Sequence, residues 1–450
     1  MMKTKIIIAF ALLVGVTSVM AQGNDSVWSL RDCIDYALKN NIQLQRSRIS
    51  RLSAEEDVLQ SQAALLPSLN ASTSQNVAYR PWVESGMSTV ANGYVQSSVD
   101  KVYYNGSYGV NMNWTVWNGN QNRNAIKQNQ LAAEQAVLDS AITANSLQEQ
   151  IAQLYVQILY RHEAIRVSKE SYATSKKNEE RGEEMVKVGK MSKADLAQLT
   201  AQRAQDEYNI VAAESNKQNY KRQLKQLLQI TDNVEFDVAI PEATDAQALA
   251  EIPSMAEVYN AALVQRPELK NSRLAIENSE LSMKIAKAGK MPTVGVNASA
   301  GTNTTSMSST TWGTQLKTNF DVGGGVTLSI PLIDGRKTKT AINKASLQRK
   351  QALLDLKDKQ TTLYSNIENY WLQAVNNQNK FKAARVSVES EQQSYYLLSE
   401  QFRLGLKNII ELMTGKDKLL TAQQNELQSK YLTILNIQLL KFYQGEEMGL

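Results

Sequence analysis

The sequence predicts a mixed, mainly α-helical fold with a few β-strands, built from one unit that occurs twice. Two long stretches, Asn120–Lys187 and Arg336–Arg403, contain no proline and a single glycine, Gly182, which favours two very long helices. Before each of them, short segments alternate apolar and polar residues with the period of two that strands require. Motifs of the first half of the chain return in the second half in the same order.

The first 21 residues have the composition of a secretory signal peptide. Lys3 and Lys5 precede an apolar run at Ile6–Val16, and Ala21 stands where the peptide would be cleaved. An uncleaved anchor helix is disfavoured because this run is too short to span a bilayer comfortably. No cysteine follows the cleavage site, so lipid attachment there is not expected. We therefore expect an exported protein that begins after residue 21.

The mature chain is nearly balanced in charge. Removing Lys3 and Lys5 lowers the formal net charge from +5 to +3 (49 − 2 − 44), which gives no reason to expect nucleic-acid binding. Cys33 is the only cysteine, so no intrachain disulfide can form, and its apolar neighbour Ile34 favours a packed thiol. After residue 21, no stretch approaches the roughly 20 apolar residues that a transmembrane helix needs.

An internal repeat divides the mature chain into two units. "AALLPSLNAS" returns as "AGKMPTVGVNAS", with Pro67 opposite Pro292 at an offset of 225 residues (292 − 67). From Gly119, opposite Gly335, the offset is 216 (335 − 119), because the first copy has the longer loop. We expect a first repeat at 22–229, an inter-repeat segment at 230–253, a second repeat at 254–445 and a C-terminal tail at 446–450.

Each unit reads as helix, strand, loop, strand, very long helix, break and long helix. The four strands are expected near 68–78, 106–117, 293–303 and 320–332. In the second of them, Val110, Met112 and Trp114 alternate with Asn111 and Asn113. Such alternation over about ten residues is typical of outer-membrane strands, although an ordinary half-buried sheet gives the same pattern.

Two observations favour the membrane interpretation of these strands. Four strands are too few to form a large core for 450 residues, and the connecting loops are rich in Ser, Thr, Asn and Gly. Four strands cannot close a barrel, and an open strand edge is not stable in lipid. We therefore expect several copies of the chain to share one barrel.

The long helices predict a rod. At a rise of 1.5 Å per residue, each uninterrupted stretch spans roughly 100 Å. Ile151, Leu154, Ile158 and Ile165 are spaced three, four and seven residues apart, which predicts a narrow coiled-coil-like seam.

Together, the signal peptide, the duplicated unit, the strand exits "VWNG" and "PLIDG" and the glycine-centred breaks resemble the TolC-like outer-membrane efflux proteins. The resemblance covers essentially the whole mature chain. It implies a homotrimer in which each protomer gives four strands to a shared twelve-stranded, porin-like outer-membrane β-barrel. The long helices would continue as a coiled-coil-like α-helical barrel through the periplasm, with segment 230–253 in an equatorial belt.

The resemblance also implies partners at the two helix breaks, "VKVGKMS" and "FRLGLKN". Members of this family join a periplasmic adaptor (membrane fusion) protein, and through it an inner-membrane pump, at such tips. A glycine at each break allows a left-handed backbone and close approach of a partner, while a plain helix C-cap needs the same residue. The contact residues that the resemblance implies are Val188, Gly189, Met191, Leu404, Gly405 and Leu406.

The resemblance further suggests a gate beside the tips. Asp195 and Glu411 each stand six residues after a tip glycine, and Lys407 stands two residues after the second one. We expect an Asp195–Lys407 contact and an inward ring of Glu411 carboxylates that attracts cations. Lys lacks the bidentate fork of the arginine often found there, and Thr414 stands where a second acid can occur. Ordinary solvated surface charges are the alternative.

Residues for catalysis or for a cofactor are not apparent. His162 lacks a second His or Cys with zinc-ligand spacing. "GEEMVKVGKMS" has Met191 where a phosphate-binding loop needs Ser or Thr, and the glycines of "DVGGGVT" lie within an expected strand. We expect no enzyme activity, no metal and no cofactor.

These inferences predict an outer-membrane exit duct of a tripartite efflux or secretion system. The duct would passively conduct substrates from the pump and adaptor to the exterior, with its helical part in the periplasm. The alternative is an outer-membrane-anchored structural or adhesive coiled-coil protein without transport activity. The sequence leaves the substrate and the choice between drug efflux and protein secretion open.

Overall fold

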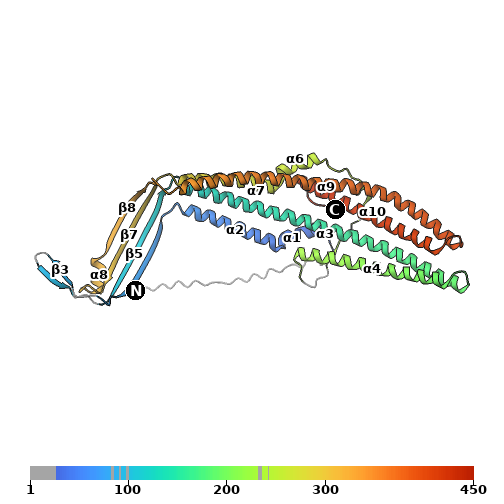
Figure 1. Cartoon of the computed structure of the whole chain (residues 1–450), viewed down its shortest axis with the longest axis horizontal. Helices are drawn as coiled ribbons and strands as arrows, with labels where there is room; N and C mark the ends of the chain where they lie inside the picture. The colour runs from blue at the N-terminus through green and yellow to red at the C-terminus, as the bar shows by residue number, and fades with distance from the viewer. Residues whose placement is uncertain are drawn as a thin grey trace, which may run out of the picture.

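The computed structural model shows an elongated molecule with a β-sheet at one end and paired helices at the other (Figure 1). It describes residues 27–82, 101–231, 236–241 and 243–449, together with the backbone of the strands at 86–90 and 93–97. The expected signal peptide at 1–21 and part of the expected inter-repeat segment lie outside the described residues. None of the helices in the described ranges is both long and apolar enough to span a membrane.

The first half of the chain builds two short and two long helices around one pair of sheet strands. Its elements are β1 (Val27–Trp28), α1 (Leu30–Asn40), α2 (Ile42–Ala63), β2 (Ser68–Tyr79), β3 (Gly86–Val90), β4 (Gly93–Ser97), β5 (Val102–Trp117), α3 (Gln121–Lys187) and α4 (Lys193–Leu228).

The second half follows the same order with additions. Its elements are β6 (Asp237–Val238), α5 (Asp245–Ala248), α6 (Met255–Gln265), α7 (Pro267–Ala288), β7 (Thr293–Thr305), α8 (Trp312–Thr318), β8 (Asp321–Ser329), α9 (Lys337–Arg403) and α10 (Ile409–Gln444).

Some elements differ from the sequence-based expectation. The sequence predicts loops for the two connections at the outer end of the sheet, which is the end away from the long helices. These connections instead contain the β3–β4 hairpin and the short helix α8. β8 ends at Ser329 rather than near 332, because Pro331 has no N–H to donate to a strand ladder. Segment 230–253 contributes β6, which pairs in parallel with β1, and the helix α5.

The two halves match closely in their dimensions. α3 and α9 each have 67 residues, and α4 and α10 each have 36. The described residues with positive φ form four pairs, each 216 residues apart: Gly119 and Gly335, Asn120 and Arg336, Gly189 and Gly405, Gln229 and Gly445. The same left-handed turns therefore end the strands and helices of both halves.

The four long strands form one antiparallel sheet in the order β2-β5-β7-β8. Val110 pairs with Ala71 on one side and with Ala300 on the other, and Ala300 pairs with Val322. The next row across the sheet consists of Asn70, Asn111, Ser299 and Gly323. Because paired residues share a face, one face is apolar and the other carries small and polar side chains. β2 and β8 are the edge strands of this sheet.

The helices form a long curved layer (Figure 1). α3 and α9 run along most of its length, with α2 and α7 beside them near the sheet, and α4 and α10 beside them near the tips. The main core lies midway, where α1, α3, α4 and α10 meet around Ile151, Tyr155 and Ile158. Cys33 is fully buried there, as the sequence suggested, and burial raises the pKa of its thiol to about 12.

Candidate functional site: the helical tips

Both long helices end at the tips in the same hydrogen-bonded turn. Gly189 N–H donates to Val186 O (3.1 Å) and Lys190 N–H donates to Met185 O (2.8 Å). Gly405 N–H donates to Phe402 O (3.0 Å), and the following residue donates to Gln401 O (2.9 Å). This is the Schellman C-cap, in which the residue after the cap adopts a left-handed backbone.

The glycines at these turns are free of side-chain contacts. Gly189 has φ +72° and Gly405 has φ +77°, and a Cβ built at either position would meet no atom within 4 Å. Glycine is therefore required by the backbone conformation and not by crowding within the chain.

The following helices begin with side-chain caps that use both candidate gate acids. Ser192 Oγ accepts from Asp195 N–H (3.1 Å), and Asn408 Oδ1 accepts from Glu411 N–H (2.9 Å). Glu411 returns a bond by accepting from Asn408 N–H (3.3 Å), which completes a capping box. Each acid thus stands at the third helical position, where its negative charge interacts favourably with the positive end of the helix dipole.

Lys407 has a different partner from the expected one. Its Nζ lies 2.6 Å from Glu411 Oε1, while Asp195 Oδ2 accepts from Ser192 Oγ at 2.8 Å. The Asp195–Lys407 contact is not formed within the described residues of one chain, where Lys407 is paired with Glu411 and Asp195 with Ser192. The bonds from Lys407 and from Asn408 N–H lower the pKa of Glu411.

The tip residues divide into an exposed and a packed group. Val188 is 66% exposed and Leu406 is 71% exposed, and Leu404 and Ile410 are similarly open. Met191 is half-buried and packs on a small tip core shared by α4, α9 and α10. That core consists of Leu199, Phe402, Ile409 and Leu412. The two tips are therefore held together by apolar contacts, and they present separate apolar side chains to the outside.

Just beyond the tip core lies a buried polar network that sequence reasoning missed. Lys416 Nζ bonds Asp206 Oδ2, and Ser175 Oγ donates to the same carboxylate oxygen. Lys416 follows Ile409 and Leu412 at helical spacing, and Asp206 follows Leu199 by seven residues. A charged residue at a position that continues the apolar face of a helix was therefore the available signal for a buried charge.

Two weaker contacts join the same hairpins at this level. Asn178 Nδ2 donates to Tyr395 Oη (3.3 Å), and Gln202 Nε2 donates to Asp417 Oδ1 (3.3 Å). Together with the buried pair they tie the α3–α4 hairpin to the α9–α10 hairpin.

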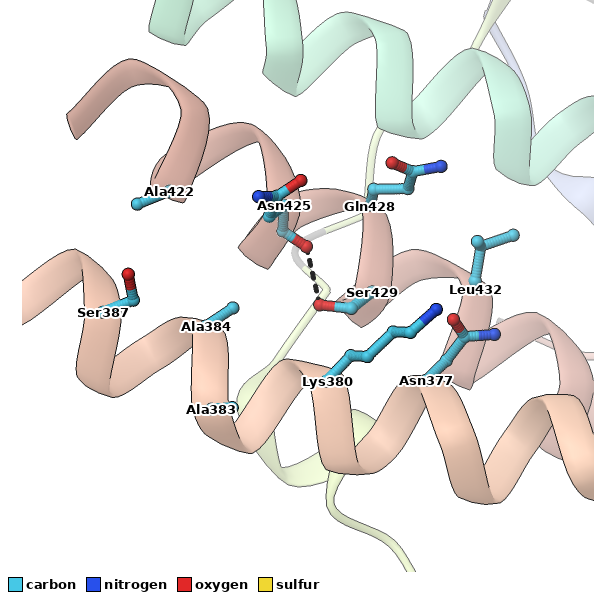
Figure 2. A pocket seen from close by; sticks show the side chains of 10 residues that line it. All are labelled: Asn377, Lys380, Ala383, Ala384, Ser387, Ala422, Asn425, Gln428, Ser429 and Leu432. Atoms are coloured by element: carbon cyan, nitrogen blue, oxygen red, sulfur yellow. Dashed lines mark hydrogen bonds between the residues drawn. The ribbon is translucent and has the colours of Figure 1, made fainter. Parts of the chain in front are cut away.

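A groove runs along the second hairpin between α9 and α10 (Figure 2). It has a volume of about 520 Å³ and is lined by small and amide side chains together with Lys380 and Leu432. Its drawn hydrogen bond runs from Ser429 Oγ to Asn425 O (2.7 Å) within α10. This lining offers no acid–base pair.

The other candidate positions have structural roles. His162 Nδ1 lies 3.0 Å from Lys217 Nζ, and burial together with that lysine lowers the pKa of the imidazole. Gly323 and Gly325 pair within the β7–β8 ladder. Across the described ranges, no group of three or more His, Cys, Asp or Glu side chains is placed to hold a metal ion.

Comparison with known proteins agrees with this architecture. The family model described as "Outer membrane efflux protein" matches residues 33–228 and 258–445. The outer membrane efflux protein BepC of Brucella suis biovar 1 (strain 1330) is 22% identical over 429 residues, covering 95% of this chain and 87% of BepC. The alkaline protease secretion protein AprF of Pseudomonas aeruginosa is 24% identical over 184 residues, covering 41% of this chain and 37% of AprF.

A solved structure shows the same fold. The CmeC outer membrane channel of Campylobacter jejuni superposes with a TM-score of 0.75 at 18% sequence identity, covering 93% of this chain and 86% of CmeC. The family match spans both halves and most of the chain, which confirms the resemblance drawn from the sequence. The chain therefore belongs to the outer membrane efflux protein family and is an outer-membrane protein.

Proposed function

We propose that the chain is the outer-membrane exit duct of a tripartite efflux or secretion system. The observation that carries this proposal is that the two ends of the molecule differ. One end is a sheet with one apolar face and two edge strands, and the other end consists of the two capped tips of the long helices. The first end suits a membrane and the second suits a periplasmic partner.

Three copies would form the duct. β2 and β8 are edge strands, and pairing β2 of one copy with β8 of the next would close a barrel of twelve strands. The apolar rows would face lipid, and the rows of Asn, Ser and Gly would face a water-filled passage. The helices would continue that passage into the periplasm, and 230–253 would form part of an equatorial belt. One ancestral unit, duplicated, accounts for the matched halves.

The tips would receive the periplasmic adaptor, which connects the duct to an inner-membrane pump. Val188, Leu404 and Leu406 offer exposed apolar side chains, while Gly189 and Gly405 leave the backbone open to close approach. Met191 would support this surface by packing on the tip core. Val188 and Leu404, which would contact the adaptor, are also the C-cap residues of α3 and α9.

The gate would be built from the charges next to these tips. Glu411 would project a ring of three carboxylates into the narrow end of the duct, each held by Lys407 of its own chain. Asp195 would hold the start of α4 in place through Ser192. An Asp195–Lys407 contact would then have to form between neighbouring copies, at the expense of the Lys407–Glu411 bond.

The proposal is tested by complementation of a deletion strain. Leu406→Asp should abolish resistance to exported compounds while leaving outer-membrane trimers intact. Val264→Asp is the matched control, since Val264 is 68% exposed on α6, away from both tips. Loss of function in both variants, or recovery of the protein as monomers outside the outer membrane, would remove the proposal. Secretion of a protein cargo instead of drug resistance would place it in the secretion class.

A further inference from the structure

The short helix α8 is fixed firmly to the outer end of β7. Gln315 is 5% exposed, and its amide Nε2 donates to Thr305 O (3.0 Å) and Thr310 O (2.8 Å). Its Oε1 accepts from Thr305 N–H (2.7 Å), and Thr302 Oγ1 donates to Leu316 O (3.0 Å). A connection that makes this many bonds to its strand holds a defined position.

The strand register shows which face of the sheet α8 covers. Thr302 pairs with Tyr108, and the Tyr108 ring meets the Trp312 ring edge-on at 6.2 Å. Along the same strands, this face continues with the pairs Ala300–Val110 and Ala298–Met112. α8 therefore lies over the end of the apolar face, opposite to the face that carries Asn111 and Ser299.

The exposed surface at this end is aromatic. Trp312 is 58% exposed although it packs on Tyr108, and Tyr79, Tyr104 and Phe320 at neighbouring strand ends are also exposed. Lys317, in the last turn of α8, is exposed and forms no ion pair with any described residue. Amphipathic rings beside a cation at the rim of an apolar band fit the layer where lipid headgroups meet acyl chains.

A second aromatic group marks the other limit of the band. Trp114 pairs with Val296 on the apolar face. A β-bulge then brings Trp117 opposite Val294, so that its ring returns to that face. Leu332 and Ile333 are almost fully exposed just after β8 leaves the sheet.

We propose that α8 is an interfacial anchor that places Trp312 in the headgroup layer of the outer leaflet and so fixes the depth of the sheet in the membrane. This inference rests on the proposed membrane location of the sheet. It goes beyond that location by naming the residue that contacts the lipid, Trp312, and the layer that it contacts, the boundary between headgroups and acyl chains. In the first half of the chain, the corresponding connection holds the β3–β4 hairpin instead, so one helix of this kind occurs per protomer among the described elements.

Tryptophan fluorescence in vesicles made with brominated phosphatidylcholine tests the proposal on the full chain. Bromines near the headgroup should quench Trp312 strongly, so Trp312→Phe should lose about one third of the lipid-quenchable signal, since three tryptophans lie on or beside the apolar face. Trp371→Phe is the control, because Trp371 lies on α9 and packs against a cluster shared with α6 and α10, so it should add no lipid-quenchable signal.

The remaining tryptophans separate two kinds of failure. If Trp114 and Trp117 are quenched by lipid but Trp312→Phe changes nothing, the sheet is in the membrane and the anchor proposal is wrong. If no tryptophan is quenched by lipid, the membrane location itself fails. A shift of Trp114 quenching towards shallower or deeper bromines in Trp312→Ala would support the depth-setting role, and an unchanged profile would contradict it.

Discussion

Lys416 on α10 bonds Asp206 on α4, and this buried pair joins the two hairpins next to the apolar tip core that they share. Asp206 is 2% exposed and Lys416 is 4% exposed. A buried ion pair adds little net stability, but removing one partner leaves an uncompensated charge. We therefore expect the pair to act as a register lock that fixes the alignment of the two hairpins and, through them, the relative height of the tips.

Single replacements of this pair should be costly and a joint replacement should not. Asp206→Leu or Lys416→Met alone should lower the free energy of unfolding by about 3–5 kcal/mol, whereas the double variant should be close to the parent protein. Thermal unfolding followed by circular dichroism measures the difference.

An exposed pair supplies the control for that experiment. Lys169 Nζ lies 2.8 Å from Glu214 Oε1, with both side chains about half exposed, so Lys169→Met should cost less than about 1 kcal/mol. Equal losses from Lys169→Met and Lys416→Met would contradict the register lock.

Each helical hairpin contains one close contact between a glycine on one helix and a leucine on the other. The glycine lies on the first helix in one hairpin and on the second helix in the other. A Cβ at Gly182 would lie 2.6 Å from Leu199 Cδ1, and a Cβ at Gly415 would lie 2.7 Å from Leu398 Cδ1. At the offset of 216 residues, position 182 corresponds to 398 and position 199 to 415. One leucine thus fills the space above one glycine in each hairpin, from opposite helices.

This exchange predicts compensation between two substitutions. Gly182→Leu should destabilise the protein by about 1–3 kcal/mol because the site is overpacked. Adding Leu199→Gly should restore most of that loss by recreating the arrangement of the second hairpin. Chemical denaturation of the parent, single and double variants measures it, and a double variant less stable than both single variants would refute the exchange.

The tip glycines should be sensitive to any side chain even though they have free space. Gly189→Ala or Gly405→Ala should each cost about 1–2 kcal/mol through the left-handed backbone alone. Gly313 also has no atom within 4 Å of a built Cβ, and its φ is not positive, so Gly313→Ala should cost nothing measurable. Hydrogen exchange of the tip amides reports the local loss, and equal protection in all three variants would argue against it.

Glu411 should control cation block of the duct. The Lys407 and Asn408 bonds lower the pKa of this carboxyl, so it stays ionised until the pH falls below its ordinary value near 4.5. Divalent block in planar bilayers should therefore persist at neutral pH, disappear as the pH falls through the lowered pKa, and be absent in Glu411→Gln. Glu389→Gln, which alters an exposed acid on α9, is the control. Unchanged block in Glu411→Gln would eliminate the ring.

Much of the fold could be predicted because its signals are local. The long helices follow from stretches without proline, and the tips follow from Gly189 and Gly405, whose backbone conformation few other residues adopt. α8 could not be predicted, because "WGTQLKT" has loop composition and its helix depends on bonds from Gln315 to β7. The Asp206–Lys416 pair joins residues 210 positions apart, a distance that no pattern in a single sequence specifies. The Lys407–Glu411 bond, by contrast, has a local signal, because the two residues stand four positions apart in the sequence.

The proposed function requires three copies of the chain to close one barrel and one duct. Electron cryomicroscopy of the purified protein in lipid nanodiscs tests it most directly, because strands and copies can be counted in the same particle. The expected result is three copies, β2 paired with β8 of the neighbouring copy, and a continuous passage from the outer rim to the tips. A different number of copies, or a sheet whose edge strands stay unpaired in the membrane, would contradict it.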